Sequence, residues 1–176
     1  MLQNIQTLKI SRTKEMIFSA VFTLLAVATP AVIHYFTGID GGRTFLPMPF
    51  FVLLAGLLLG WRAGLATAIA SPLISYFISG MPMANILPFI TLQLVAYGAV
   101  AGTMREKHNA IISVAGAILA GWAIIGISMF LFSKMNAWSY VIQGVRAGLL
   151  GIIIQLIAIP AIVFLIQSNF RDEKGI

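Results

Sequence analysis

The sequence contains no cysteine and few charged residues, and each shortage excludes a class of protein. Without cysteine the chain has neither disulfides nor thiolate metal ligands. Charged residues make up 9% of its 176 residues, whereas a soluble globular domain carries about 25%. Asp and Glu together number five, too few to favour a carboxylate metal site or a pair of catalytic acids. This composition excludes an ordinary water-soluble domain.

Sequence motifs for catalysis or nucleotide binding are also missing. Neither the phosphate-binding pattern GxxxxGK[ST] nor the zinc pattern HExxH occurs. The two histidines, His34 and His108, lie far apart, and no Ser-His-Asp set falls on one plausible face. The net charge of +6 is spread between apolar segments, which argues against a nucleic-acid-binding patch. We therefore expect no enzyme, no metal site and no cofactor.

Apolar residues dominate the sequence, at 60% of the total. A helix that crosses a bilayer needs about 20 mostly apolar residues. Six segments reach or approach this length, and the second and third are short and separated by Trp61 and Arg62. Gly60 and Gly64 flank that point and favour a tight turn over one long helix. The sequence predicts an all-α membrane protein with six transmembrane helices in a compact bundle, over residues 16–36, 46–60, 63–78, 86–104, 110–132 and 140–167.

The positions of Lys and Arg predict the orientation, because cytoplasmic loops carry an excess of both. With the N-terminus inside, only Arg43 and Lys134 lie in outer loops, and Arg146 lies near the outer end of the sixth segment. We expect a cytoplasmic N-terminal segment (1–15), a membrane domain (16–167) and a cytoplasmic C-terminal tail (168–176). Eight cationic residues then face the cytoplasm: Lys9, Arg12, Lys14, Arg62, Arg105, Lys107, Arg171 and Lys174.

Small residues recur four positions apart, as at Gly144 and Gly148 or at Ala66 and Ala70. Such pairs allow helix backbones to approach closely in a membrane. They indicate either packing inside the bundle or docking against a second membrane subunit, and the sequence leaves both open.

Arg146, in the motif GVRAG, is the most prominent polar candidate, because charged residues inside a membrane are costly and usually functional. Its long side chain could also reach the headgroups as an anchor. We favour ligand binding, because Gly144 and Gly148 indicate a face turned toward protein. A buried Arg would favour a carboxylate or phosphate on the ligand.

The remaining polar candidates gather in the predicted outer half. Gln93 and Tyr97 share a helix face at i, i+4 spacing. Trp138 fits an interfacial aromatic belt or a ligand-stacking role equally well, whereas Gln155 lies deeper and could cross-link helices. The candidate ligand-binding residues are Arg43, Asn85, Gln93, Tyr97, Trp138, Gln143 and Arg146.

Three stretches carry a family resemblance: LPMPFFVLLAGLLLGWRAGLATAIASPLISYFISGMP (46–82), ITLQLVAYGAVAG (90–102) and GIIIQLIAIPAIV (151–163). The first resembles the second and third helices of the substrate-binding S components of energy-coupling factor (ECF) transporters, and the others are similar to the fourth and last helices. Two features depart from the family. Pro49 stands where the similar stretch often has His, and the first helix lacks a clean AxxxA docking motif, with Ser19 and Thr23 as its nearest small-xxx-small pair.

The resemblance implies a multi-pass protein of the bacterial cell membrane that captures a vitamin or related micronutrient outside the cell. A transmembrane T component and two cytoplasmic ATPases would complete the importer, and the S component would reorient in the membrane to deliver its ligand. If Arg146 lines the pocket, an acidic ligand of the pantothenate, niacin or folate class is favoured. A neutral ligand such as riboflavin or a thiamine precursor stays open.

Two other function classes remain as alternatives. A self-contained secondary transporter of small solutes would need coupling residues, and no Asp or Glu lies within a predicted span. A membrane-embedded enzyme would need catalytic groups. An assembly scaffold would bind no small molecule.

Overall fold

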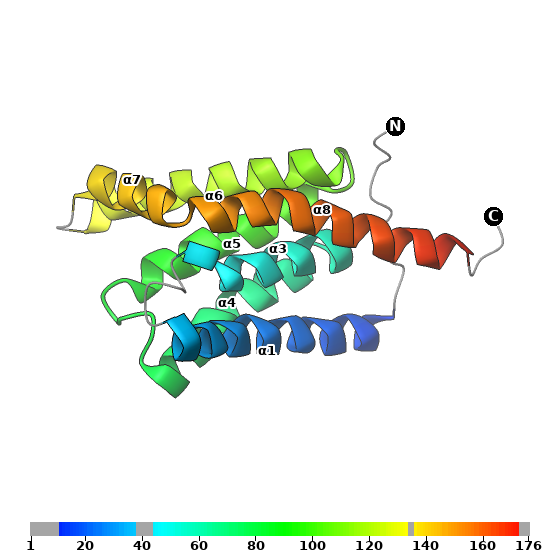
Figure 1. The fold of residues 1–176 in the computed structure, drawn as a ribbon, viewed down its shortest axis with the longest axis horizontal. Helices are drawn as coiled ribbons and strands as arrows, with labels where there is room; N and C mark the ends of the chain where they lie inside the picture. Colours follow the sequence, from blue (N-terminus) through cyan, green and yellow to red (C-terminus); the bar gives the residue numbers. More distant parts are fainter. Residues whose placement is uncertain (1–10, 38–43, 134–135, 173–176) are drawn as a thin grey trace.

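The computed structural model describes residues 11–37, 44–133 and 136–172, which form a bundle of helices (Figure 1). The predicted all-α fold is confirmed, since the described residues form seven helices and no strand. Four stretches, within α1, α5, α6 and α8, are long and apolar enough to cross a membrane. The predicted six spans and the side on which the termini lie remain predictions. The helices are α1 (Arg12–Thr37), α3 (Pro47–Leu59), α4 (Trp61–Ser79), α5 (Leu87–Met104), α6 (Ala110–Phe132), α7 (Ala137–Ala147) and α8 (Leu149–Asp172).

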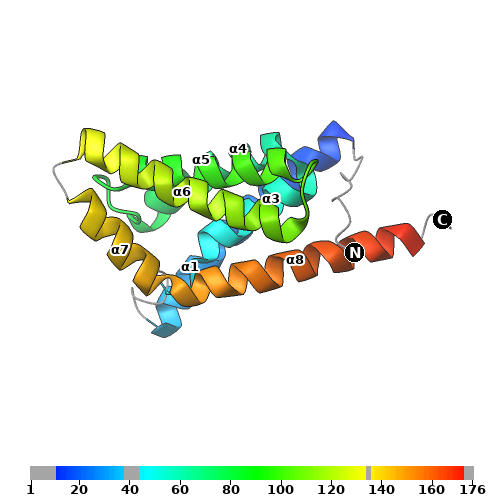
Figure 2. The same ribbon diagram turned by 90° about the horizontal axis from the view of Figure 1, so that it is seen from above.

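The helices define two ends of the molecule. All except α7 lie roughly along its long axis, and successive ones run in opposite directions (Figure 1). The start of α1 and the end of α8 lie toward one end, which we call the terminal end. The short helix α7 lies at the opposite end, which we call the α7 end (Figures 1 and 2).

The predicted break between the second and third segments is confirmed at Gly60, which separates α3 from α4. Gly60 has a φ of 112°, in a region that side chains rarely adopt, and its N–H donates to the Gly56 carbonyl at 3.0 Å. The next helix starts at once, because the Gly64 N–H donates to the Gly60 carbonyl at 2.9 Å. The two helices therefore form a hairpin with a one-residue turn.

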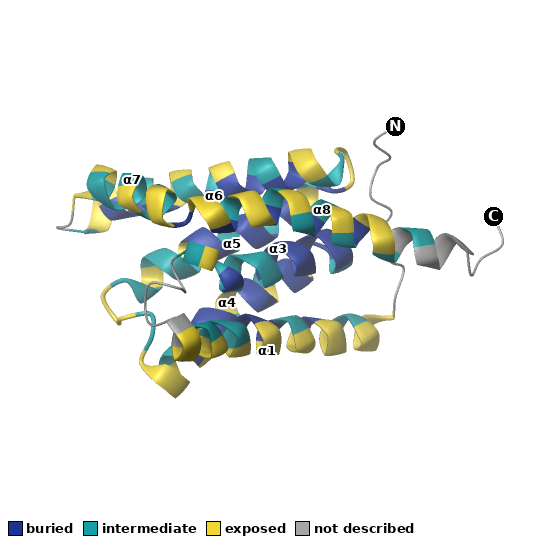
Figure 3. Ribbon diagram, in the orientation of Figure 1, coloured by how far each residue is buried: buried dark blue, intermediate teal, exposed yellow. Residues whose placement is uncertain are grey.

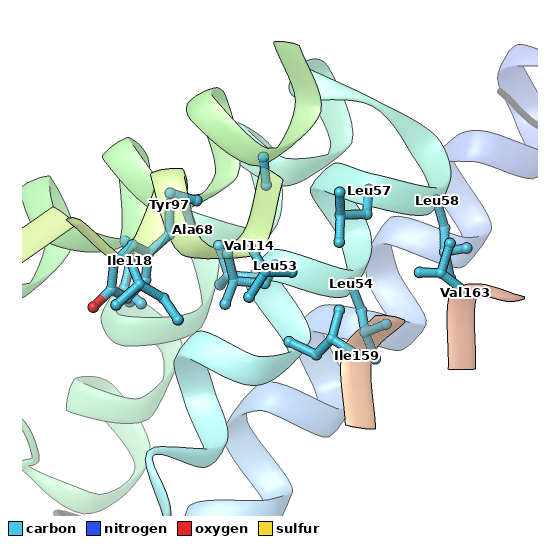
Figure 4. Packing of buried hydrophobic residues seen from close by; sticks show 14 residues of the cluster. Leu53, Leu54, Leu57, Leu58, Ala68, Tyr97, Val114, Ile118, Ile159 and Val163 are labelled. Atoms are coloured by element: carbon cyan, nitrogen blue, oxygen red, sulfur yellow. The ribbon is translucent and has the colours of Figure 1, made fainter. Parts of the chain in front are cut away.

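The short helix α3 lies at the centre of the bundle, where every residue from Val52 to Leu58 is buried (Figure 3). Leu54 and Leu58 pack toward Ile159 and Val163 of α8 (Figure 4). Burial on all sides accounts for the all-round apolar sequence of α3, which shows no polar stripe. The most apolar segment of the resemblance therefore forms the protein core.

Glycines allow α3, α4 and α5 to touch through their backbones. A Cβ atom at Gly98 of α5 would lie 2.5 Å from the Gly64 carbonyl oxygen of α4. One at Gly56 of α3 would lie 2.9 Å from the Gly98 carbonyl oxygen. Real Cβ atoms do not approach backbone so closely, so even alanine would force these helices apart. The small residues of this region therefore serve internal packing, one of the two roles left open by the sequence.

Arg105 follows α5 and has a structural role that its place in a loop did not indicate. Its side chain is buried, and Nη1 donates to the Leu57 carbonyl at 2.9 Å, near the C-terminus of α3. A cation there satisfies a free carbonyl and complements the helix dipole. Burial lowers the pKa of the Arg105 guanidinium, and the carboxylates of Glu106 and Glu15 act in the opposite direction.

The sixth predicted segment, 140–167, differs from the structure, because it is divided into α7 and α8 at Gly148. The two helices meet at an angle (Figure 2). Helix α7 starts earlier than predicted, since the Asn136 side chain caps it by accepting the Ser139 N–H at 3.0 Å. None of its residues is buried. Gln143 and Arg146 interrupt the apolar run before Gly148, but the prediction of one segment over 140–167 passed over them.

Candidate functional site

Gln93 and Tyr97 form a buried polar pair in the middle of α5. The Gln93 Nε2 donates to the Tyr97 hydroxyl at 3.1 Å, as their i, i+4 spacing predicted. The Tyr97 side chain is 1% exposed and that of Gln93 is 9% exposed. Their side chains hydrogen-bond to each other inside the bundle, where neighbouring helices shield both from the outer surface.

Helix α6 packs on this pair at Gly121 and on α7 at the next residue, Trp122. Gly121 lies against the Tyr97 ring, and a side chain there would overlap the ring. The next residue, Trp122, turns toward α7, where its ring lies against Gly144. The Trp122 Nε1 is buried and has no hydrogen-bond partner among the described residues. A buried indole N–H without an acceptor is unusual and indicates a place where a bound molecule could supply one.

Polar side chains occupy the face of α7 opposite to its packed face. Gln143 is exposed and its Nε2 donates to the Ser139 hydroxyl at 2.8 Å, while Arg146 is exposed in the last turn. Gly144 packs on α6, as the sequence indicated. Arg146 is two residues further along, and two residues rotate a helix position by about 200°. Its guanidinium therefore lies away from the packed face and makes no ion pair within the described chain.

The start of α8 contacts the residues that lead into α3. Gln155 Nε2 donates to the Leu46 carbonyl at 3.1 Å, so this side chain links two segments, as its depth suggested. A side chain at Gly151 would collide with the backbone of Phe45, and one at Gly148 with the side chain of Leu46. Leu46 itself has a φ of 48°, an uncommon value for leucine. These contacts bring the segment at 44–46 beside the junction of α7 and α8.

Two further candidates lie at the surface of the α7 end. Asn85 is exposed in the connection before α5, and the Trp138 side chain at the start of α7 is 75% exposed. Arg43 lies outside the described residues. The structure thus joins Gln93 to Tyr97 directly and places Gln143 and Arg146 on one face of α7.

Trp122 is the residue that the sequence reasoning missed. Tryptophan in membrane proteins is typical of the interfaces, yet Trp122 lies in the middle of the 23 residues of α6. A tryptophan in the middle of an apolar segment was therefore the signal in the sequence that could have identified Trp122.

These features define a helical, multi-pass membrane protein with a hydrogen-bonded polar pair inside its bundle and a polar face on α7. The sequence of residues 14–163 matches a known family, described as the ECF transporter, substrate-specific component. The chain belongs to this family, and the resemblance seen in the sequence is confirmed. Its members are subunits of transporters and not enzymes. No curated protein and no solved structure matches the chain.

Proposed function

We propose that this S component captures a vitamin or related micronutrient at the α7 end, facing the outside of the cell. Membership of the family over residues 14–163 carries the proposal. The polar face of α7 supports it, because Gln143 and Arg146 are exposed at that end.

The ligand carries an anionic group in this proposal. Arg146 is the only fully charged side chain among the described residues of the α7 end, and no carboxylate there neutralises it. Its exposed guanidinium is free to bind a carboxylate or phosphate in two-pronged geometry. Ligands of the pantothenate, niacin or folate class have this chemistry.

Delivery requires partners, since the sequence has no nucleotide-binding motif of the GxxxxGK[ST] type. We assign the energy to two cytoplasmic ATPases that act through a transmembrane T component. The S component reorients in the bacterial cell membrane to release its ligand inside. The distribution of charge suits such a movement, because every Asp, Glu, Lys or Arg among the described residues lies near a helix end or in a connection. When the S component reorients, no charged side chain from the middle of a helix therefore has to cross the hydrocarbon core.

Isothermal titration of the purified chain against a panel of vitamins tests the capture function. One acidic vitamin is expected to bind, and Arg146→Gln is expected to weaken its binding by about tenfold or more, as loss of a charge-assisted hydrogen bond does. Lys107→Gln is the matched control, since it removes an exposed cation of the opposite end and is expected to leave affinity unchanged.

The outcomes separate the parts of the proposal. Unchanged affinity in Arg146→Gln would remove the anionic ligand and leave the capture function standing. Absence of binding to every vitamin would contradict capture itself. Uptake by the chain alone in liposomes would show a self-contained transporter and contradict the need for partners.

A further inference from the structure

A groove of about 910 Å³ runs between α1 and α4, away from the candidate ligand site. The groove exists because small side chains on both helices leave the space between them unfilled. Ser19, Ala20 and Thr23 face it from α1, and Ala63, Ala66 and Ala70 face it from α4. Helix α1 lies along a flank of the molecule, where most of its outward residues are exposed (Figure 3). The groove therefore opens sideways, toward the space that hydrocarbon fills around a membrane protein.

The two ends of the groove differ in charge. At the terminal end it is lined by Arg12 of α1 and Arg62 of α4, with Glu15 close by. Further along, the lining contains only small or apolar residues and ends at Ile74 and Ile78. A cationic mouth followed by an apolar channel matches an amphiphile with an anionic head and a hydrocarbon tail.

The single carboxylate at the mouth does not neutralise both guanidinium groups. Burial lowers the pKa of Arg105, and Glu15, which also acts on that guanidinium, opposes this shift only in part. Neither Arg12 nor Arg62 makes an ion pair with a carboxylate among the described residues, and Arg62 instead lies over the Trp61 ring at 5.3 Å from its centre. Two cations, one from each wall, are thus available to a ligand that approaches the same point.

We propose that the groove binds an anionic phospholipid of the leaflet at the terminal end. The phosphate contacts Arg12 and Arg62, and an acyl chain lies along Ala66 and Ala70 toward Ile74. An empty groove in a bilayer would forfeit the dispersion contacts of its lining, so acyl chains fill it whenever no protein does. With the expected orientation this is the inner leaflet. The assignment does not depend on which vitamin the α7 end captures.

Native mass spectrometry of the protein, released from mixed phosphatidylglycerol and phosphatidylcholine nanodiscs, tests the proposal. The wild-type chain is expected to retain phosphatidylglycerol in preference. Arg12→Gln and Arg62→Gln are each expected to reduce that preference by about fivefold, the usual effect of one cation near an anionic lipid surface. Lys107→Gln, which removes an exposed cation of the same end outside the groove, is the matched control and is expected to leave the preference unchanged.

A second variant tests the channel. Ala66 is exposed within the groove, so Ala66→Leu fills the space without disturbing the core and is expected to reduce retention of both lipids. Equal retention of the two lipids by the wild type, or full preference in Arg12→Gln with Arg62→Gln, would overturn the proposal. If Ala66→Leu instead retains lipid normally but no longer copurifies with a T component, the groove is a seat for a partner helix and the lipid assignment is wrong.

Discussion

The contact between Gly121 and the Tyr97 ring gives a prediction that links packing to the candidate site. A methyl group at position 121 would overlap the ring, so Gly121→Ala must displace Tyr97 and disturb its hydrogen bond with Gln93. Overpacking of a core costs about 1–3 kcal/mol. The same substitution gains about 1 kcal/mol of helix propensity.

Gly126→Ala, on the same helix, separates these two effects. A Cβ at Gly126 would meet only the tip of Val141, at 3.3 Å. Both variants gain the same propensity, so the difference in their free energies of unfolding isolates the clash with Tyr97. We expect Gly121→Ala to be less stable than Gly126→Ala by about 1–3 kcal/mol.

Equilibrium unfolding in detergent micelles measures this difference, and titration with the vitamin identified in the panel measures its effect on binding. In a Tyr97→Leu background the clash is removed, so Gly121→Ala is expected to behave like Gly126→Ala. Equal stability of the two single variants would refute the close contact between α5 and α6. So would a Gly121→Ala penalty that persists without the Tyr97 ring.

Three further changes test other contacts. Arg105→Met removes the guanidinium that caps α3 at Leu57 and is expected to cost about 2 kcal/mol of unfolding free energy. The stability of Arg105→Lys is expected to lie between those of the wild type and Arg105→Met. Equal stability of all three proteins would exclude the cap. Gln155→Leu removes one of two donors to the Leu46 carbonyl and leaves the Phe50 N–H at 3.4 Å, so it is expected to cost about 0.5–1.5 kcal/mol in the same assay, whereas an unaffected protein would mean that water replaces the amide. Asn136→Ala removes the cap of α7 and is expected to speed amide hydrogen exchange in α7 and not in α6, and uniform exchange would contradict a separate helix.

Helix positions followed from the sequence where composition changes sharply. The fifth predicted segment coincides with α6, because the polar Asn109 caps its start and Ser133 ends it. Gly60 marked the turn between α3 and α4, because its flanking charge and glycines interrupt an otherwise apolar run. The division at Gly148 was missed because its immediate neighbours, Ala147 and Leu149, are apolar, although Gln143 and Arg146 make α7 more polar than α8.

Side-chain direction was less predictable than helix position. The spacing of Gln93 and Tyr97 gave their contact, because i, i+4 neighbours must meet on a helix. The glycines of GVRAG indicated a packed face correctly, but their proximity in sequence did not place Arg146 on that face. The burial of Arg105 depends on the end of α3, which lies 48 residues earlier in the chain, and no local pattern reports such a contact.

The central position of α3 constrains how the protein is made. With 13 residues it is about 20 Å long, shorter than the hydrocarbon core, so it is poorly suited to residing alone in a bilayer. The one-residue turn at Gly60 means that α4 must enter the membrane together with it as a single unit. Its Leu54 and Leu58 stay without their packing partners Ile159 and Val163 until α8 has been synthesised (Figure 4). A nascent chain that stops before α8 would expose these apolar side chains of α3. Chaperones and proteases that bind exposed apolar surface would then recognise the chain as incomplete.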